Sequence, residues 1–163
     1  MSEGIKTITA LGGANEFACY LYVRRGETHT LRKDHAAALK DFTYAIDSKM
    51  SNCLDVFEKR ADIYAVRGNW RVAIDDYSRE MALFEHRIPR LHAKRGNAYL
   101  RSGEPEKAVA DLDQALEFSS CGPLFRIRAE ALRLLSKNDL ADQDERKAVE
   151  YSRGRSNDQC AFR

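Results

Sequence analysis

The sequence predicts an all-α protein built from repeated pairs of antiparallel helices, and three observations support this. Apolar residues recur at helical spacing on both sides of short polar or glycine-containing breaks. The same chemical pattern returns every 35 residues along the 163-residue chain. The composition, 44% hydrophobic and 32% charged with a net charge of +2, suits folded helices with large solvated faces. A fixed period between about 20 and 50 residues indicates a stacked array of helical units.

The clearest unit runs over residues 94–116, where two helices meet at Ser102-Gly103. Gly103 ends the first helix, because a residue without Cβ adopts the left-handed conformation at little cost. Pro105 opens the second helix at a position where no helical N–H is lost. This stretch predicts helices near 89–102 and 104–118.

Two earlier stretches, 24–46 and 59–83, repeat this pattern. They share a small residue in the first helix, an alanine in the second, an aspartate three residues later and a large apolar residue after the aspartate. These four columns hold Gly26, Ala61 and Gly96; Ala38, Ala73 and Ala108; Asp41, Asp76 and Asp111; and Phe42, Tyr77 and Leu112. The earlier stretches predict helices near 16–31, 34–48, 53–67 and 70–84, with Asp34 as an N-cap.

These columns resemble the tetratricopeptide repeat (TPR) family, well over about 19–119 and weakly over 123–152. Lys33 departs from the turn glycines of the other repeats, and Glu80 replaces a small residue. The resemblance implies a right-handed TPR solenoid of antiparallel helix pairs. Residues 1–15 are expected to form a flexible or loosely docked arm, and residues 153–163 a polar tail. Residues 16–152 are expected to form a single TPR domain, with repeats at about 19–50, 54–86 and 89–119 and a degenerate fourth repeat at 123–152 as the C-terminal cap.

Several classes of function find no support in the sequence. It contains no recognised catalytic constellation, phosphate-binding loop or metal-ligand spacing, so we predict no enzyme activity, no cofactor and no metal. The longest apolar run covers residues 17–23, far short of the roughly 20 residues that cross a bilayer. The small net charge gives no case for nucleic-acid binding. The N-terminus lacks the pattern of a signal peptide, and the four widely spaced cysteines predict reduced thiols in a cytoplasmic protein.

An arginine stands 16 residues before each aspartate of the repeated column. The three pairs are Arg25 with Asp41, Arg60 with Asp76, and Arg95 with Asp111. We expect each pair to form an ion pair between the two helices of one repeat, since a guanidinium and a carboxylate fix each other's geometry.

The resemblance implies that the first helices line a concave groove. The groove residues expected on this basis are Tyr20, Arg24, Lys59, Arg90, Lys94, Asn97, Arg101 and Arg128. Glu27 and Asp62 follow Arg24 and Lys59 by three residues and are expected to neutralise them. Asn97, in the same column, carries no charge. The groove is therefore expected to be acidic near the second repeat and basic near the third repeat and the cap.

The sequence therefore predicts a non-catalytic protein–protein interaction module, an adaptor or scaffold. Its expected ligand is an extended peptide or a partner helix in the groove, with an acidic or carboxylate end toward Arg90, Lys94, Asn97 and Arg101. The alternative is a structural protein that self-assembles into homo-oligomers and has no groove ligand. The charges could also serve only to solvate the groove. Repeat folds carry many unrelated functions, so the fold does not choose among these.

Overall fold

The chain is all-α, as predicted. The computed structural model describes residues 15–48, 55–84 and 88–154, and these ranges contain eight α-helices and no strand. The chain divides into two compact units, Met1–Asn69 and Trp70–Arg163. The predicted N-terminal arm and polar tail lie outside the described residues, apart from Asn15, Arg153 and Gly154.

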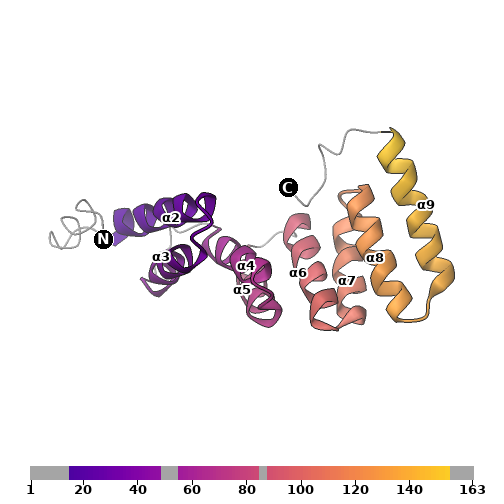
Figure 1. The fold of residues 1–163 in the computed structure, drawn as a ribbon, viewed down its shortest axis with the longest axis horizontal. Helices are drawn as coiled ribbons and strands as arrows, with labels where there is room; N and C mark the ends of the chain where they lie inside the picture. The colour runs from indigo at the N-terminus through magenta and orange to yellow at the C-terminus, as the bar shows by residue number, and fades with distance from the viewer. Residues whose placement is uncertain (1–14, 49–54, 85–87, 155–163) are drawn as a thin grey trace. The chain divides into compact units, whose positions relative to one another are not determined.

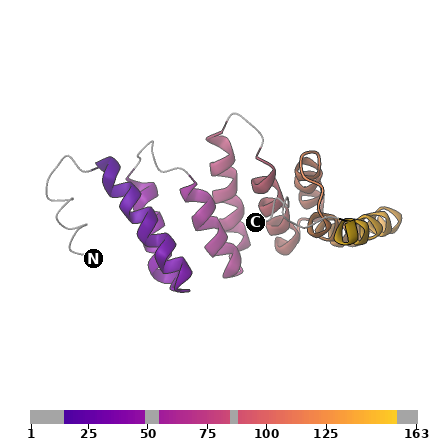
Figure 2. The same ribbon diagram turned by 90° about the horizontal axis from the view of Figure 1, so that it is seen from above.

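The first unit consists of α2 (Asn15–Leu31), α3 (His35–Asp47) and α4 (Val56–Val66). Helices α2 and α3 form a pair that lies side by side in both views (Figure 1, Figure 2), and both contact α4. The close approach of α2 to α3 depends on Gly26, because a Cβ at that position would lie 2.6 Å from Cε1 of Phe42. The core of this unit consists of Ala18, Cys19, Tyr22, Val23, Ala38, Phe42, Ala45, Val56 and Ile63.

The second unit consists of α5 (Trp70–Ala82), α6 (Pro89–Ser102), α7 (Pro105–Leu116), α8 (Gly122–Leu134) and α9 (Asn138–Gly154). Tight turns join α6 to α7 and α8 to α9, and α5 packs on α6 while α7 packs on α8 (Figure 1). One cluster of its core consists of Ala93, Leu100, Ala108, Leu112, Ala115, Cys121, Leu124 and Ala131.

The break between paired helices has the same backbone geometry in each unit. Gly68 and Gly103 adopt φ of +76° and +83°, which ends the helices before them as predicted. Lys33 and Ser136 adopt left-handed φ of 59° and 58° at the corresponding breaks. Asp34 caps α3 as predicted, since its side chain accepts a hydrogen bond of 3.1 Å from the N–H of Ala37.

The C-terminal pair α8/α9, expected to be a degenerate repeat, retains more of the repeated residue columns than predicted. Its columns recur 33 residues after those of the third repeat, whereas the earlier columns are spaced by 35. In this register the alanines Ala129, Ala141 and Ala148 are fully buried at the small-residue positions of the repeat. The connection between α7 and α8 is shorter, so these columns do not fall on the 35-residue period of the earlier repeats.

The prediction of reduced thiols is wrong for both described cysteines. Cys19 and Cys121 are buried and disulfide-bonded. Cys53 and Cys160 lie outside the described residues. Wide spacing in the sequence is a poor guide here, because folding can bring distant cysteines together. No helix within the described ranges combines the length and apolarity that a membrane span requires.

Candidate functional site

Buried ion pairs between paired helices recur along the chain. Arg25 donates to Asp41 with Nε 2.7 Å from Oδ2, and Arg95 donates to Asp111 with contacts of 2.7 and 2.8 Å. Two of the three predicted ion pairs are therefore present. The hydrogen bond to its aspartate raises the pKa of each guanidinium. Arg60 and Asp76 belong to different units, and their pairing stays a prediction.

A further pair of this kind, which we did not predict, lies in the C-terminal helix pair. Arg128 donates to Asp144 through Nε and Nη2, both at 2.7 Å. The separation of 16 residues is the same as in the other pairs, so this spacing could have identified it. Arg128 occupies the repeat position that Arg25, Arg60 and Arg95 hold in the earlier repeats, and we call these four residues the arginine column.

Arginines of this column also reach the second helix of the preceding repeat. Nη1 of Arg60 lies 3.1 Å from Oγ1 of Thr43, and Nη1 of Arg95 lies 3.0 Å from Oγ of Ser78. Arg128 makes the corresponding contact with a carboxylate, at 2.6 Å from Oδ1 of Asp113. Each of these guanidiniums links neighbouring repeats. The contacts of the arginine column therefore stabilise the packing of neighbouring helices.

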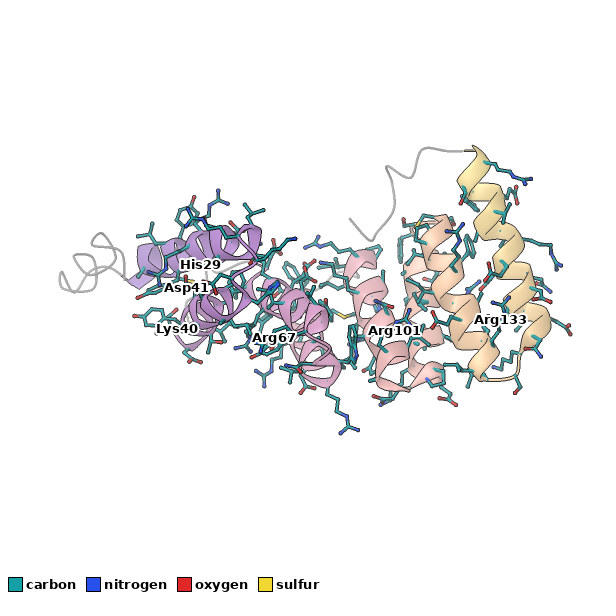
Figure 3. All side chains as sticks on the ribbon, in the orientation of Figure 1. His29, Lys40, Asp41, Arg67, Arg101 and Arg133 are labelled. Carbon is teal, nitrogen blue, oxygen red and sulfur yellow. The ribbon has the colours of Figure 1, made fainter. Side chains whose placement is uncertain are left out.

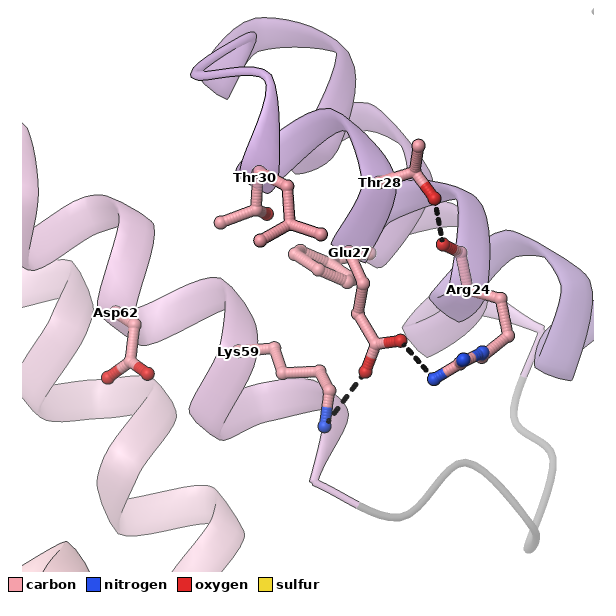
Figure 4. A pocket seen from close by; sticks show the side chains of 8 residues that line it. Arg24, Glu27, Thr28, Thr30, Lys59 and Asp62 are labelled. Carbon is pink, nitrogen blue, oxygen red and sulfur yellow. Dashed lines mark hydrogen bonds and ion pairs between the residues drawn. The ribbon is translucent and has the colours of Figure 1, made fainter. Parts of the chain in front are cut away.

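A pocket within the first unit opens on the face that α2 and α4 share. Its volume is about 540 Å³. It is lined by Arg24, Glu27, Thr28, Thr30, Leu31, Phe42, Lys59 and Asp62. Figure 4 shows Arg24 and Lys59 toward one end of this pocket, and Thr30 and Asp62 toward the other. Two residues of the predicted groove, Arg24 and Lys59, therefore meet in one cavity.

Glu27 holds these two cations together. Arg24 Nη1 lies 2.7 Å from Oε2 of Glu27, and Lys59 Nζ lies 3.4 Å from its Oε1 (Figure 4). The predicted pair of Arg24 with Glu27 is present, whereas Lys59 pairs across to the neighbouring helix. Two cations share one carboxylate, so this end of the pocket carries a net positive charge.

Exposed aliphatic side chains stand at the ends of the two helices, α2 and α4, that share this pocket. Leu31, the last residue of α2, is 85% exposed, and Val66, the last residue of α4, is 73% exposed. Val66 follows the pocket residue Asp62 by four residues, which places it on the same side of α4 one turn further on. Phe42 adds the edge of a core ring to the pocket. This apolar part was not predicted, because Leu31 and Val66 are not among the groove positions that the resemblance implies.

The other predicted groove residues are distributed over both units. Tyr20 lies exposed on α2. In the second unit, Arg90, Lys94 and Asn97 share one side of α6 by their spacing of four and three residues. Arg101, at the end of α6 (Figure 3), forms a double hydrogen bond of 2.8 and 3.0 Å with Glu130 of α8. Both side chains are exposed. The charge of Arg101 is partly neutralised by this contact.

The described residues contain no cluster of three or more His, Cys, Asp or Glu side chains arranged to hold a metal ion. Buried carboxylates of the repeated column are engaged by arginines in the pairs described above. What remains exposed on the first helices is a mixture of cations, hydroxyl groups and aliphatic side chains, which suits contact with another chain.

Comparison with known proteins establishes the fold. No protein-family profile and no curated sequence matches the chain. Among solved structures, MamA from Desulfovibrio magneticus RS-1, beginning at residue 41, aligns with a TM-score of 0.79 and 12% identity over 94% of this chain and 86% of that chain. Another MamA crystal structure aligns with a TM-score of 0.75 and 16% identity over 91% of this chain and 86% of that chain. MamA is a protein of the TPR type, and at these identities the likeness concerns the fold alone.

Proposed function

We propose that this protein is a non-catalytic scaffold of the TPR type that binds an extended peptide or helix of a partner protein along its first helices. The observation that carries the proposal is the open pocket between α2 and α4, where Arg24, Lys59 and the exposed Leu31 meet. Exposed aliphatic side chains beside solvated charges are typical of a protein-binding surface.

The charged residues fall into two groups, one that binds other helices of the fold and one at the predicted groove positions, and this supports the proposal. Arg95 and Arg128 of the arginine column each bind an aspartate of their own helix pair and a side chain of the preceding repeat, so they serve the fold. The cations at the predicted groove positions of α2, α4 and α6 lie outside the arginine column, and we assign recognition to them. In the second unit, Arg90, Lys94 and Asn97 would receive an acidic or carboxylate end of the ligand.

The proposal is tested by capture from a native lysate with the Lys94→Glu/Asn97→Ala variant beside wild type. The matched control is Lys107→Glu/Gln114→Ala, which makes the same kinds of change on α7. We expect the partner to be lost only by the α6 variant at an unchanged melting temperature. Retention by both variants would contradict binding on the first helices. A concentration-dependent oligomer without any partner would favour the self-assembly alternative.

A further inference from the structure

The ends of α2 and α4 in the first unit combine exposed aliphatic side chains with exposed cations. Leu31 is followed directly by Arg32 and Lys33, and Val66 is followed by Arg67. All five side chains are exposed. The three cations form no hydrogen bond or ion pair through their side chains with any other described residue. We call these five residues the α2/α4 edge.

Helix ends alone do not explain this composition. Cations at the last turn of a helix are favourable because the helix dipole is negative there. That effect requires no aliphatic residue beside them. A leucine 85% exposed and a valine 73% exposed lose the contribution that burial would make. Leu31 lines the open pocket, and Val66 lies one helical turn beyond the pocket residue Asp62. An occupant that covers both side chains would recover it.

The charge of this face indicates the chemistry of that occupant. Five cations, Arg24, Arg32, Lys33, Lys59 and Arg67, stand on the pocket and its edge, against the three carboxylates Glu27, Asp34 and Asp62. The difference is a net charge of +2. Asp34 already accepts a hydrogen bond as the cap of α3, and Glu27 is shared by two cations. The face is therefore complementary to a ligand that is acidic and apolar.

We propose that the α2/α4 edge docks a partner's acidic linear segment, in which one or two aliphatic side chains are flanked by Asp or Glu. The aliphatic side chains cover Leu31 and Val66 and enter the pocket over Phe42, while the flanking carboxylates meet Arg32, Lys33 and Arg67. This inference rests on the proposed function, because it names the ligand chemistry for one part of the same face.

The test uses a fluorescently labelled peptide with two central leucines flanked by glutamates, titrated with the whole chain by anisotropy. Two variants test the aliphatic and the cationic side chains of the edge separately. Leu31→Ser/Val66→Ser removes the aliphatic side chains, and Arg32→Gln/Arg67→Gln removes two of the cations. The matched controls are Leu83→Ser/Phe118→Ser, which removes exposed apolar residues of the second unit, and Lys40→Gln on α3. In Figure 3, Lys40 and Arg67 lie well apart on the first unit.

We expect the serine variant to weaken binding about tenfold or more, since it removes the apolar contact. The glutamine variant should weaken binding about fivefold to tenfold and reduce its dependence on salt. The controls should bind like wild type. The inference is overturned if wild type does not bind the peptide, if a lysine-flanked peptide binds equally well, or if both edge variants bind like wild type.

Vesicles containing phosphatidylserine distinguish a protein ligand from an anionic membrane surface. Binding of the whole chain to such vesicles through the edge residues, without binding to the peptide, would overturn the inference in favour of a membrane. A native partner lost by Lys94→Glu/Asn97→Ala but retained by both edge variants would overturn the inference and leave the proposed function standing. Peptide binding at the edge, with no native partner on the first helices, would contradict the proposed function alone.

Discussion

Arg128 of the arginine column has a structural role, which its contacts explain. Its guanidinium contacts the buried Asp144 of its own helix pair and Asp113 of the preceding repeat. It also lies 5.7 Å from the centre of the Phe125 ring, which adds a cation–π contact. A side chain engaged in this way fixes the geometry of three helices.

Replacing Asp144 with alanine tests this role. We expect a loss of about 2–4 kcal/mol in the free energy of unfolding, because the change leaves the Arg128 guanidinium without its buried partner. Urea unfolding followed by circular dichroism measures it. The control Glu145→Ala removes an exposed contact to Arg133 and should cost less than about 1 kcal/mol. Equal costs for the two variants would contradict a structural role for the buried pair.

The left-handed residues at the helix breaks give a second prediction. Ser136 adopts φ of 58°, a conformation that costs a residue with a Cβ about 1 kcal/mol. Ser136→Gly should therefore stabilise the protein by about 0.5–1 kcal/mol. Gly103→Ala, at the corresponding break, should destabilise it by a similar amount. Thermal unfolding of the two variants should move in opposite directions, and a shift in the same direction would refute this explanation of the turns.

Helix pairs are held at short distance by small residues, and α2 with α3 shows the effect most clearly. A Cβ at Gly26 would lie between 2.6 and 3.0 Å from three atoms of the Phe42 ring. The ring is buried, and a methyl group at position 26 would force it to move. The distance between these two helices therefore depends on a glycine.

We expect Gly26→Ala to destabilise the protein by about 1–3 kcal/mol, because the overpacked ring must move, even though alanine favours the helix. The single variant Phe42→Leu should also destabilise the protein, because it leaves a cavity. The double variant should be more stable than the sum of the single effects predicts, since the shorter side chain accommodates the new methyl group. Strict additivity in a double-mutant cycle would show that the two positions are not in contact.

The sequence predicted the helices well because each break carries a local signal. The N-cap at Asp34, the turn at Gly103 and the pairs of Arg25 and Arg95 were all found where expected. Long-range packing was harder to predict. Lys59 pairs with Glu27 of another helix rather than with Asp62 three residues on, since the distance between repeats is not visible in the sequence.

The register of the last helix pair was missed for a different reason. A connection two residues shorter shifts every column, so Arg128 was assigned to the groove by its place along the helix. The exposed aliphatic side chains at the ends of α2 and α4 were also missed, because Leu31 and Val66 look like ordinary members of an apolar helical pattern. Only their exposure in the folded chain distinguishes them.

The chain as a whole is expected to depend on oxidation, because both described cysteines are disulfide-bonded. Disulfides typically contribute about 2–5 kcal/mol to small domains, so reduction should lower the melting temperature. Alkylation of the denatured protein, followed by mass spectrometry with and without prior reduction, counts the free thiols. Complete alkylation of all four cysteines without reductant would contradict this expectation.

Site-specific photo-crosslinking of the whole chain in a native lysate tests whether a partner protein binds the first helices. A photoreactive residue would replace Arg24, Lys59 or Lys94 on the first helices, or Lys40 or Lys107 on the second helices as controls. We predict adducts to a distinct partner protein from the first group only. Equal adducts from both groups, or adducts only to a second copy of the chain, would contradict the proposed binding role.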